Sequence, residues 1–420
     1  MILLIIKMTY NSPDAATTGT GKSSPMADYV KFLPKDFPLP TFYTPDERQL
    51  LVGTSLSAAL DQKLASLERE FEHLRECTGH LTWCQELWWD EDDACLTIDD
   101  WKLADAMYRS RALELPKSGG DAMVPVLDMA NHAFDDHYNA RFDIDEKDGS
   151  VVLIVREGKT VSKDDEVTIM YGAGGACEMI FSYGFVEEDS SSAREMYLGL
   201  SMLPDDPLRR AKTELAREAP GVRLFVDGTG KVQWDSLFVW WACVNEEDGL
   251  DFQVLQTNEG GRELKALWKG APLGPSDLRS TLQRDERADV FLLRAIVLVQ
   301  QRVESQGMAL ATSDDSFEQA IGSKNVGQQT WRTIKKLREL ELELLTASFE
   351  MLEEEASIPL LPCKCRLTLT RKNDCYKCQR YRTTLGSAKS VRPTEQLRRM
   401  TFRKQCFPLL VVRRWPGARY

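Results

Sequence analysis

Three aromatic residues near the middle of the chain are of the types that can line an apolar channel. Tyr171 ends the β-branched run 166–171, and Tyr183 and Phe185 follow it closely. A lysine side chain that enters an apolar, aromatic channel loses its proton more easily than it does in water. A tyrosine hydroxyl in such a channel can orient the neutral amine, so this spacing suits chemistry at an amine nitrogen.

Four polar residues precede these aromatic residues: Arg111, Asp128, Asn131 and His132. All of these residues also have simpler explanations. A tyrosine at the end of a strand most often buries its ring and satisfies its hydroxyl. A lone histidine is more often structural, and Arg111 and Asp128 could simply pair with each other. The significance of these residues therefore rests on their occurrence together and in order, rather than on any one of them.

In order and spacing, four segments between residues 101 and 189 resemble the SET domain of protein methyltransferases. They are Ser110-Arg111-Ala112, Asn131-His132, the run 166–171 and Tyr183-Gly184-Phe185. They resemble in particular the branch that contains the Rubisco large-subunit and ribosomal-protein lysine methyltransferases. The resemblance links several motifs over roughly eighty residues, which makes it more specific than any single motif.

The resemblance implies an enzyme, a protein-lysine N-methyltransferase that moves a methyl group from S-adenosylmethionine (SAM) to a lysine of a protein substrate. Such a transfer is an in-line displacement, in which positioning and desolvation supply much of the rate. The implied site residues are catalytic Tyr171 and Tyr183, cofactor-binding Arg111, Asn131 and His132, and substrate-binding Asp128 and Phe185, with no metal ion. A histidine acceptor stays open, because one relative in this branch methylates histidine.

The expected fold class is α+β: a partial SET β-fold with a helical insert, followed by an all-α domain similar to the family's substrate-binding domain. The expected parts of the chain are a disordered leader (1–27), the helical insert (28–104), the C-terminal SET core (105–189), the helical domain (190–356) and a disordered basic tail (357–420). The leader is rich in Ser, Thr, Gly and Ala, a composition that cannot bury a core.

Local signals predict the elements that would position the site. Thr44-Pro45-Asp46-Glu47 predicts a helix start, with threonine as the cap and proline in the first position. Apolar residues at helical spacing predict helices over 57–77, from about 97 to 111, over 288–303 and over 328–355. Short β-branched or aromatic runs predict strands at 124–127, 140–144, 151–156 and 166–171, with a hairpin turn at Lys147-Asp148-Gly149.

One part of the SET pattern is not found. SET domains begin with a Gly-x-Gly strand that wraps the methionine part of SAM, and here only the leader precedes the insert-like region. We therefore expect the first strands and part of the cofactor pocket to be absent. There are two alternatives to an active enzyme: a non-catalytic SET-derived interaction module, or an incomplete gene model that lacks an upstream exon.

The charge and the cysteine content of the chain limit its possible partners and its compartment. The net charge of -12 argues against nucleic-acid binding by the whole chain, although residues 357–420 hold 16 of its 53 basic residues and only 2 of its 65 acidic ones. Cysteines at 363, 365, 375 and 378 could bind zinc, but an unstructured tail is favoured. Ten scattered cysteines without a secretory signal indicate a reducing compartment, the cytoplasm or nucleus. No run is long enough to span a membrane.

Overall fold

The computed structural model of the chain describes residue 29 and the segments 32–89, 96–115, 120–134, 136–172, 174–216, 219–256, 261–321 and 323–360. These residues combine helices with small sheets, which confirms the α+β class. They fall into two compact units. Of the described residues, the first unit holds those up to Arg194 together with Gln319–Leu340, and the second holds Glu195–Glu318 and those from Glu341 to residue 360.

Some expectations from the sequence concern residues outside the described segments. The leader 1–27, the tail from residue 361 and the four tail cysteines lie outside the described residues. The Gly-x-Gly strand was expected to be missing from the same N-terminal region, so that expectation also falls there. The division of the chain at residues 27, 104, 189 and 356 stays a prediction.

The helical part of the first unit begins with helices that local capping fixes. The short η2 (Pro40–Phe42) leads into α3 (Pro45–Gln49), where Thr44 and Glu47 form the predicted capping box. Helix α4 (Ser55–Thr78) buries leucines along one face: Leu56, Leu60, Leu67 and Leu74. Helix α6 (Ile98–Arg109) starts from a second capping box. Both long helices predicted for this region are therefore confirmed.

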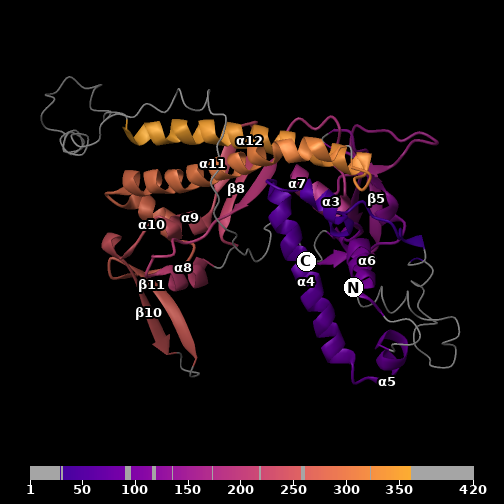
Figure 1. Ribbon diagram of the computed structural model, residues 1–420, viewed down its shortest axis with the longest axis horizontal. Helices are drawn as coiled ribbons and strands as arrows, with labels where there is room; N and C mark the ends of the chain where they lie inside the picture. Colours follow the sequence, from indigo (N-terminus) through magenta and orange to yellow (C-terminus); the bar gives the residue numbers. More distant parts are fainter. Residues whose placement is uncertain are drawn as a thin grey trace, which may run out of the picture. The chain divides into compact units, whose positions relative to one another are not determined.

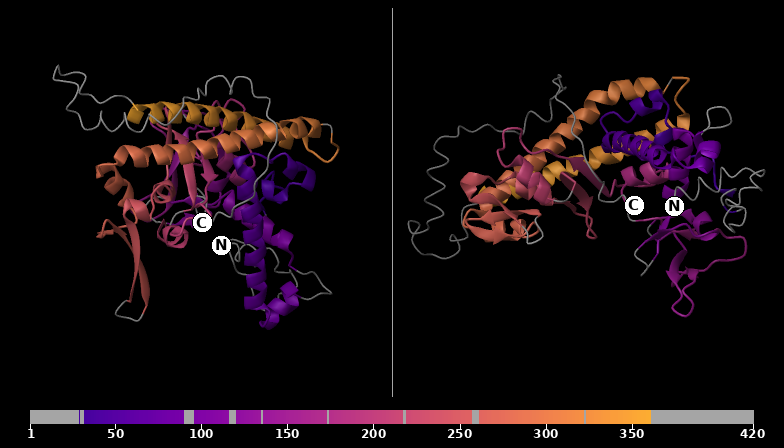
Figure 2. Two further views of the ribbon diagram at one scale, coloured as in Figure 1. Left: turned by 60° about the vertical axis from the view of Figure 1, so that its left-hand side comes forward. Right: turned by 90° about the horizontal axis from the view of Figure 1, so that it is seen from below.

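The far end of α4 carries an aromatic cluster. There α5 (Thr82–Cys84) and η3 (Gln85–Trp89) pack against the helix, as Figures 1 and 2 show. Trp88 and Trp101 are buried in this cluster, and the rings of Trp83 and Trp88 meet edge to face at 4.8 Å. A buried ion pair of 2.7 Å between Lys63 and Asp105 joins α4 to α6.

The strands of the first unit are short and form small sheets. β1 (Leu113–Glu114) pairs with β2 (Asp121–Ala122), and β4 (Ala140–Ile144) pairs antiparallel with β5 (Val151–Val155). β3 (Asn131–His132) and β6 (Thr168–Ile169) form a parallel pair. α7 (Ala176–Tyr183) follows β6. The predicted strands at 140–144 and 151–156 are thus confirmed, and that at 166–171 is confirmed over its two central residues.

The predicted hairpin turn is present, and one predicted strand is not. The amide of Gly149 donates to the carbonyl of Asp145 at 2.9 Å, and Gly149 has a φ of 73°, which glycine adopts without strain. Residues 124–127 were expected to be a strand, and this was wrong. The chain turns there instead and forms η4 (Leu127–Met129), with Asp128 donating from its amide to the carbonyl of Val124 at 3.1 Å. Pro125 cannot donate to a ladder, and this favours the turn.

The second unit mixes strands with helices. β7 (Glu195–Gly199), β8 (Gly221–Val226) and β9 (Val232–Asp235) form one antiparallel sheet, with α8 (Arg209–Ala216) between β7 and β8. After α9 (Leu237–Ala242) and η5 (Glu246–Asp248), a second sheet contains β10 (Leu250–Gln256), β11 (Arg262–Trp268) and β12 (Ala271–Leu273). α10 (Leu278–Arg284), α11 (Ala288–Ala320) and α12 (Gln328–Leu360) complete the described chain.

The expectation that this C-terminal domain would be all-α was therefore wrong. Two three-stranded sheets precede its long helices. The local signal for the first was present in the turn between β8 and β9, where the side chain of Asp227 accepts from the amide of Thr229 at 2.8 Å. The long helices at 288–303 and 328–355 are confirmed, and both extend further than predicted.

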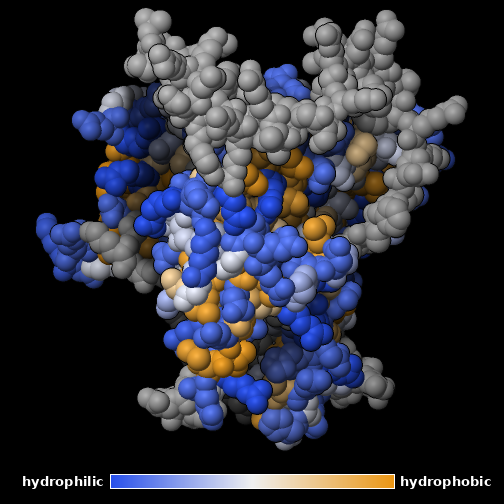
Figure 3. Space-filling model, turned by 90° about the vertical axis from the view of Figure 1, so that its left-hand side faces the viewer, coloured by the Kyte–Doolittle hydropathy of each residue, from blue (hydrophilic) through white to orange (hydrophobic). Residues whose placement is uncertain are grey.

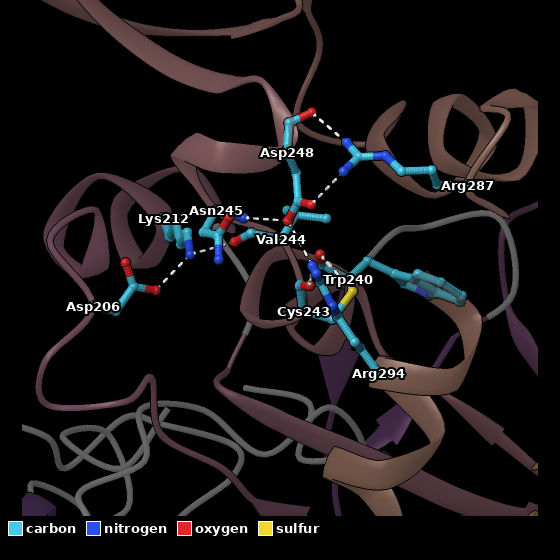
Figure 4. Close-up of polar contacts among 9 residues, drawn as sticks. All are labelled: Asp206, Lys212, Trp240, Cys243, Val244, Asn245, Asp248, Arg287 and Arg294. Carbon is cyan, nitrogen blue, oxygen red and sulfur yellow. Dashed lines mark hydrogen bonds and ion pairs between the residues drawn. The ribbon is translucent and has the colours of Figure 1, made fainter. Parts of the chain in front are cut away.

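A buried polar cluster joins α8, η5 and α11 in the second unit (Figure 4). The carboxylate of Asp248, whose side chain is 2% exposed, accepts from Arg287 at 3.1 Å and from Arg294 at 2.6 Å. Beside it, the ammonium of Lys212 donates to Asp206 and to the carbonyl of Val244. Each buried charge thus has an opposite charge and further hydrogen bonds, the condition under which burial is tolerated.

The coloured part of the surface in Figure 3 is mainly hydrophilic, with apolar side chains scattered in small groups. Isolated apolar side chains of this kind need no special explanation. Among the described residues, no helix is both long and apolar enough to cross a membrane.

Removal of the Asp248 carboxylate should destabilise the second unit strongly. Asp248→Ala leaves two guanidinium groups facing a site without a negative charge, and we expect a loss of about 3–5 kcal/mol in the free energy of unfolding. The matched control is Asp235→Ala, because Asp235 is 62% exposed in its 3.1 Å ion pair with Arg279. There we expect less than about 1 kcal/mol. Urea unfolding measures both, and similar losses would contradict the role given to Asp248.

Candidate active site

The candidate site is built on the parallel pair of β3 and β6. Asn131 lies opposite Thr168 and His132 opposite Ile169, so the two motifs that the sequence singled out meet at this point. The amide of Ala133 continues the pairing with a 3.1 Å hydrogen bond to the carbonyl of Ile169. Each strand is only two residues long, and side-chain contacts therefore contribute much of the cohesion.

His132 is the centre of these contacts. The backbone amide of Tyr171 donates to its Nδ1 at 3.0 Å, which assigns the ring proton to Nε2. Nε2 is buried without a hydrogen-bond partner among the described residues, and the nearest charged oxygen, on Glu187, is 3.9 Å away. Burial first, and the positive charge of Arg194 second, lower the pKa of His132 to about 4. The ring is therefore neutral at physiological pH.

Tyr171 lies between His132 and Tyr183. Its ring centroid is 5.1 Å from that of His132 and 4.6 Å from that of Tyr183, and its hydroxyl donates to the carbonyl of Ala130 at 2.9 Å. Burial raises the pKa of Tyr171, and burial raises the pKa of Tyr183 as well. Both phenols thus stay protonated, and each presents a hydroxyl donor rather than a basic phenolate.

Phe185 completes an aromatic wall. Its ring lies 6.0 Å from His132 and 6.4 Å from Tyr183, within the range in which aromatic rings interact. α7 ends at Tyr183, and Gly184 then takes a left-handed conformation with a φ of 83°. This turn places Tyr183 and Phe185 on either side of a sharp change in chain direction.

Arg111 and Asp128 pair with each other, which is the simpler of the two explanations considered for them. The guanidinium of Arg111 donates to the Asp128 backbone carbonyl at 2.9 Å and lies 3.7 Å from its carboxylate, whose side chain is fully buried. The pair is incomplete, however. One oxygen of Asp128 and Nε of Arg111 are buried without hydrogen-bond partners among the described residues.

Asn131 is the one candidate whose side chain points away from the ring cluster. Its amide donates to the carboxylate of Glu166 at 2.5 Å, and the residue is exposed. Asn139, just before β4, ties that strand to the β6 segment, because its side-chain oxygen accepts from the amide of Thr168 at 2.9 Å and its side-chain amide donates to the carbonyl of Glu166. The Asn131 side chain thus fastens β3 to the start of the β6 segment.

Sequence reasoning missed two residues that contact this site. Tyr29 donates a hydrogen bond from its hydroxyl to the carboxylate of Asp128 across 99 positions of sequence, and no local pattern announces such a contact. Arg194 lies behind His132 and contributes to its lowered pKa. Within the described residues, no group of His, Cys, Asp and Glu side chains has the arrangement of a metal site.

Comparisons with known sequences point to one class of protein. A family model described as cytochrome c lysine N-methyltransferase 1 matches residues 84–201. SET domain-containing protein 8 of Schizosaccharomyces pombe is 25% identical over 280 residues, which are 66% of this chain and 61% of that protein. The actin-histidine N-methyltransferase of Danio rerio is 25% identical over 187 residues, 43% of this chain and 30% of that protein. The chain thus spans less than two thirds of the length of either relative.

Solved structures decide the fold. The SET domain of LSMT bound to lysine and AdoHcy superposes with a TM-score of 0.57 at 15% identity, over 91% of this chain and 81% of that chain. The chain has a SET fold. Rubisco LSMT bound to AdoMet gives a TM-score of 0.55 at 16% identity, over 89% and 80%. The resemblance seen in the sequence of the SET core is therefore confirmed.

Gly184 should be the glycine of the SET core that is most sensitive to substitution. An added Cβ would lie 2.6 Å from the carbonyl oxygen of Pro38, and the left-handed backbone would also be strained. We expect Gly184→Ala to lower the free energy of unfolding by about 3 kcal/mol, from strain and overpacking together.

Gly158→Ala is the control, because Gly158 has a φ of 76° and nothing within 4 Å of the added atom. It should cost about 1 kcal/mol, from backbone strain alone. Chemical unfolding of both variants measures the difference. Equal losses would show that the contact with Pro38 is unimportant.

Proposed function

We propose that this chain is a SAM-dependent protein-lysine N-methyltransferase. The observation that carries the proposal is Tyr171, a half-buried, protonated phenol just after β6, whose ring packs at a tilt against that of Tyr183 with centroids 4.6 Å apart. A protonated phenol can donate to or orient an amine without competing for its proton. The SET fold and the methyltransferases among the relatives support the same reaction.

The residues of the chain would act mainly by positioning. SAM, when bound, supplies a methyl group on a sulfonium, which an amine nitrogen displaces in line. Tyr183 and Phe185 would exclude water from the amine, and in such surroundings a lysine binds its proton less tightly. The Tyr171 hydroxyl donates its proton to the carbonyl of Ala130, so its oxygen would accept from an amine N–H and thereby direct the nitrogen lone pair toward the methyl group. His132 meanwhile holds the Tyr171 backbone through its 3.0 Å hydrogen bond.

The unsatisfied polar atoms fit a charged cofactor and an amine substrate. Arg111 has a buried guanidinium nitrogen without a partner among the described residues, and a guanidinium suits the carboxylate of SAM. Asp128 has a buried oxygen in the same condition, and a carboxylate suits an ammonium group. Asn131 and His132 would contact SAM largely through the backbone of β3.

The acceptor in this proposal is a lysine of a protein substrate, ribosomal or nuclear, met in the cytoplasm, the nucleus or both. Lysine is favoured because the family model that covers all the candidate residues is named for a lysine methyltransferase. One relative is named for methylation of a histidine in actin. Histidine is thus the second acceptor to test.

The alternative function is a non-catalytic SET-derived module that holds a protein partner. Cofactor binding separates the two functions, since an interaction module has no use for SAM.

Calorimetric titration of the full chain with SAM tests the pocket directly. We expect saturable binding, and we expect Asn131→Ala to weaken it about tenfold, or ~1.4 kcal/mol, because β3 loses its tie to Glu166. Asn325→Ala is the matched control, since Asn325 is exposed and bonds to Asp46 in the same unit. An absence of binding by the unmodified chain at millimolar SAM would reject the enzyme and favour the interaction module.

Loss of the Tyr171 hydroxyl should separate binding from chemistry. Tyr171→Phe keeps the ring and the backbone bond to His132, so SAM affinity should stay within about twofold, while methyl transfer should fall at least about 100-fold because the hydroxyl that orients the amine is lost. Radiolabelled SAM with purified cytochrome c, actin and ribosomal proteins measures transfer, and amino-acid analysis distinguishes methyl-lysine from methyl-histidine. Tyr138→Phe is the control. Undiminished transfer by Tyr171→Phe would exclude Tyr171 from catalysis.

A further inference from the structure

Three side chains pack in a row next to Tyr171: His132, Phe134 and the positively charged Arg194. The guanidinium of Arg194 lies 4.1 Å from the ring centroid of Phe134. The ring of Phe134 meets that of His132 edge to face at 4.2 Å, and His132 in turn lies 5.1 Å from Tyr171. Phe134 is buried, so the stack is a packed column that connects Arg194 to the candidate catalytic tyrosine.

We propose that Arg194 is a positioning residue, which acts through Phe134 to keep His132 a hydrogen-bond acceptor for the backbone of Tyr171. An imidazole can accept at Nδ1 only while it is neutral, because both ring nitrogens of an imidazolium are donors. Protonation of His132 would therefore break its bond to the Tyr171 amide and release the segment that carries the Tyr171 hydroxyl. The consequence for catalysis rests on the proposed methyltransferase function, whereas the control of His132 does not.

The charged and titratable groups that face His132 oppose one another. Glu187, from the segment after α7, has a carboxylate oxygen 3.9 Å from Nε2 and favours the imidazolium. The Ile169 backbone acts in the same direction, while burial and Arg194 act against it and together lower the pKa of His132 to about 4. Tyr171 is neutral, because burial raises its pKa. Among the described residues, Arg194 is the positive side chain that lowers the pKa of His132, and its charge acts against that of Glu187.

The backbone around Arg194 aims its side chain at this place. Arg194 has a φ of 61°, a left-handed conformation that arginine rarely adopts. The Ser192 hydroxyl accepts from its amide at 3.0 Å, and the carbonyl of the preceding Ala193 accepts from the first residue of α7 at 3.0 Å. The surrounding structure therefore holds an uncommon conformation that directs the guanidinium onto Phe134.

Nuclear magnetic resonance of the histidine rings tests the proposal without an activity assay. The chain has only four histidines, so their ring Cε1–H signals can be assigned with single substitutions. In the unmodified chain we expect the His132 signal to stay in its neutral position from pH 8 to pH 5.5. In Arg194→Met the midpoint should rise by about one pH unit, so that roughly a quarter of His132 is protonated at pH 5.5.

Two controls separate charge from packing. Arg194→Lys keeps the charge and should keep His132 neutral, within about half a pH unit of the unmodified chain. Arg156→Met removes a similar stack, because the Arg156 guanidinium lies 3.7 Å from the ring of Tyr138, and it should leave the His132 signal unchanged. If Arg194→Met does not fold, Arg194→Gln serves in its place. An unshifted His132 signal in Arg194→Met, or in Arg194→Gln where it serves as the replacement, would overturn the proposal.

The pH profile of methyl transfer gives the functional readout. Protonation of the acceptor amine is common to both chains, so it cancels in the ratio of kcat for Arg194→Met to kcat for the unmodified chain. This ratio should fall by about a quarter between pH 8 and pH 5.5, with the KM for SAM within about twofold. A shifted His132 signal with a ratio that does not change with pH would overturn the positioning role. If the unmodified chain methylates none of the three acceptors, the proposed function fails, while the NMR result still decides whether Arg194 controls His132.

Discussion

The parallel pair of β3 and β6 is the constraint on which the candidate site depends. It joins segments that lie more than thirty residues apart, yet each strand contains only two residues. Such a short pair cannot hold by its ladder alone. The Tyr171 amide on His132, the Tyr171 hydroxyl on the carbonyl of Ala130 and the Asn131 amide on Glu166 supply the missing contacts. The residues that would perform chemistry are thus also the residues that hold the strands together.

Burial favours the uncharged form of each titratable ring at the centre of this site. Desolvation raises the pKa of Tyr171 and Tyr183 and lowers that of His132, and in all three cases the neutral form results. Four charged side chains lie around these rings: Arg111, Asp128, Glu187 and Arg194. A neutral, weakly polar interior favours an uncharged amine, and the charged margin can hold groups that remain ionised.

The sequence predicted the elements that depend on contacts between neighbouring residues. It did not predict those that depend on contacts between residues far apart in the chain. The helix starts at Thr44 and Thr97 could be predicted because a capping side chain bonds within three residues. The pairing of Asn131 with Thr168 was not predicted, since nothing in either segment specifies a parallel partner. The six strands of the second unit were missed because their pairing, like the contact of Tyr29 with Asp128, depends on residues far apart in sequence.

The incomplete pair of Arg111 and Asp128 bears on the choice between enzyme and interaction module. A fully buried carboxylate oxygen without a hydrogen bond costs about 1–3 kcal/mol, and more when it is charged. A protein that only held a partner through another surface would gain stability from an apolar residue here. The buried polar atoms are reasonable, however, if a ligand with a carboxylate and an amine completes their hydrogen bonds. Both charges act on Tyr171, so these atoms lie close to the ring cluster, and their unmet hydrogen bonds favour a site that binds small charged groups within the SET core.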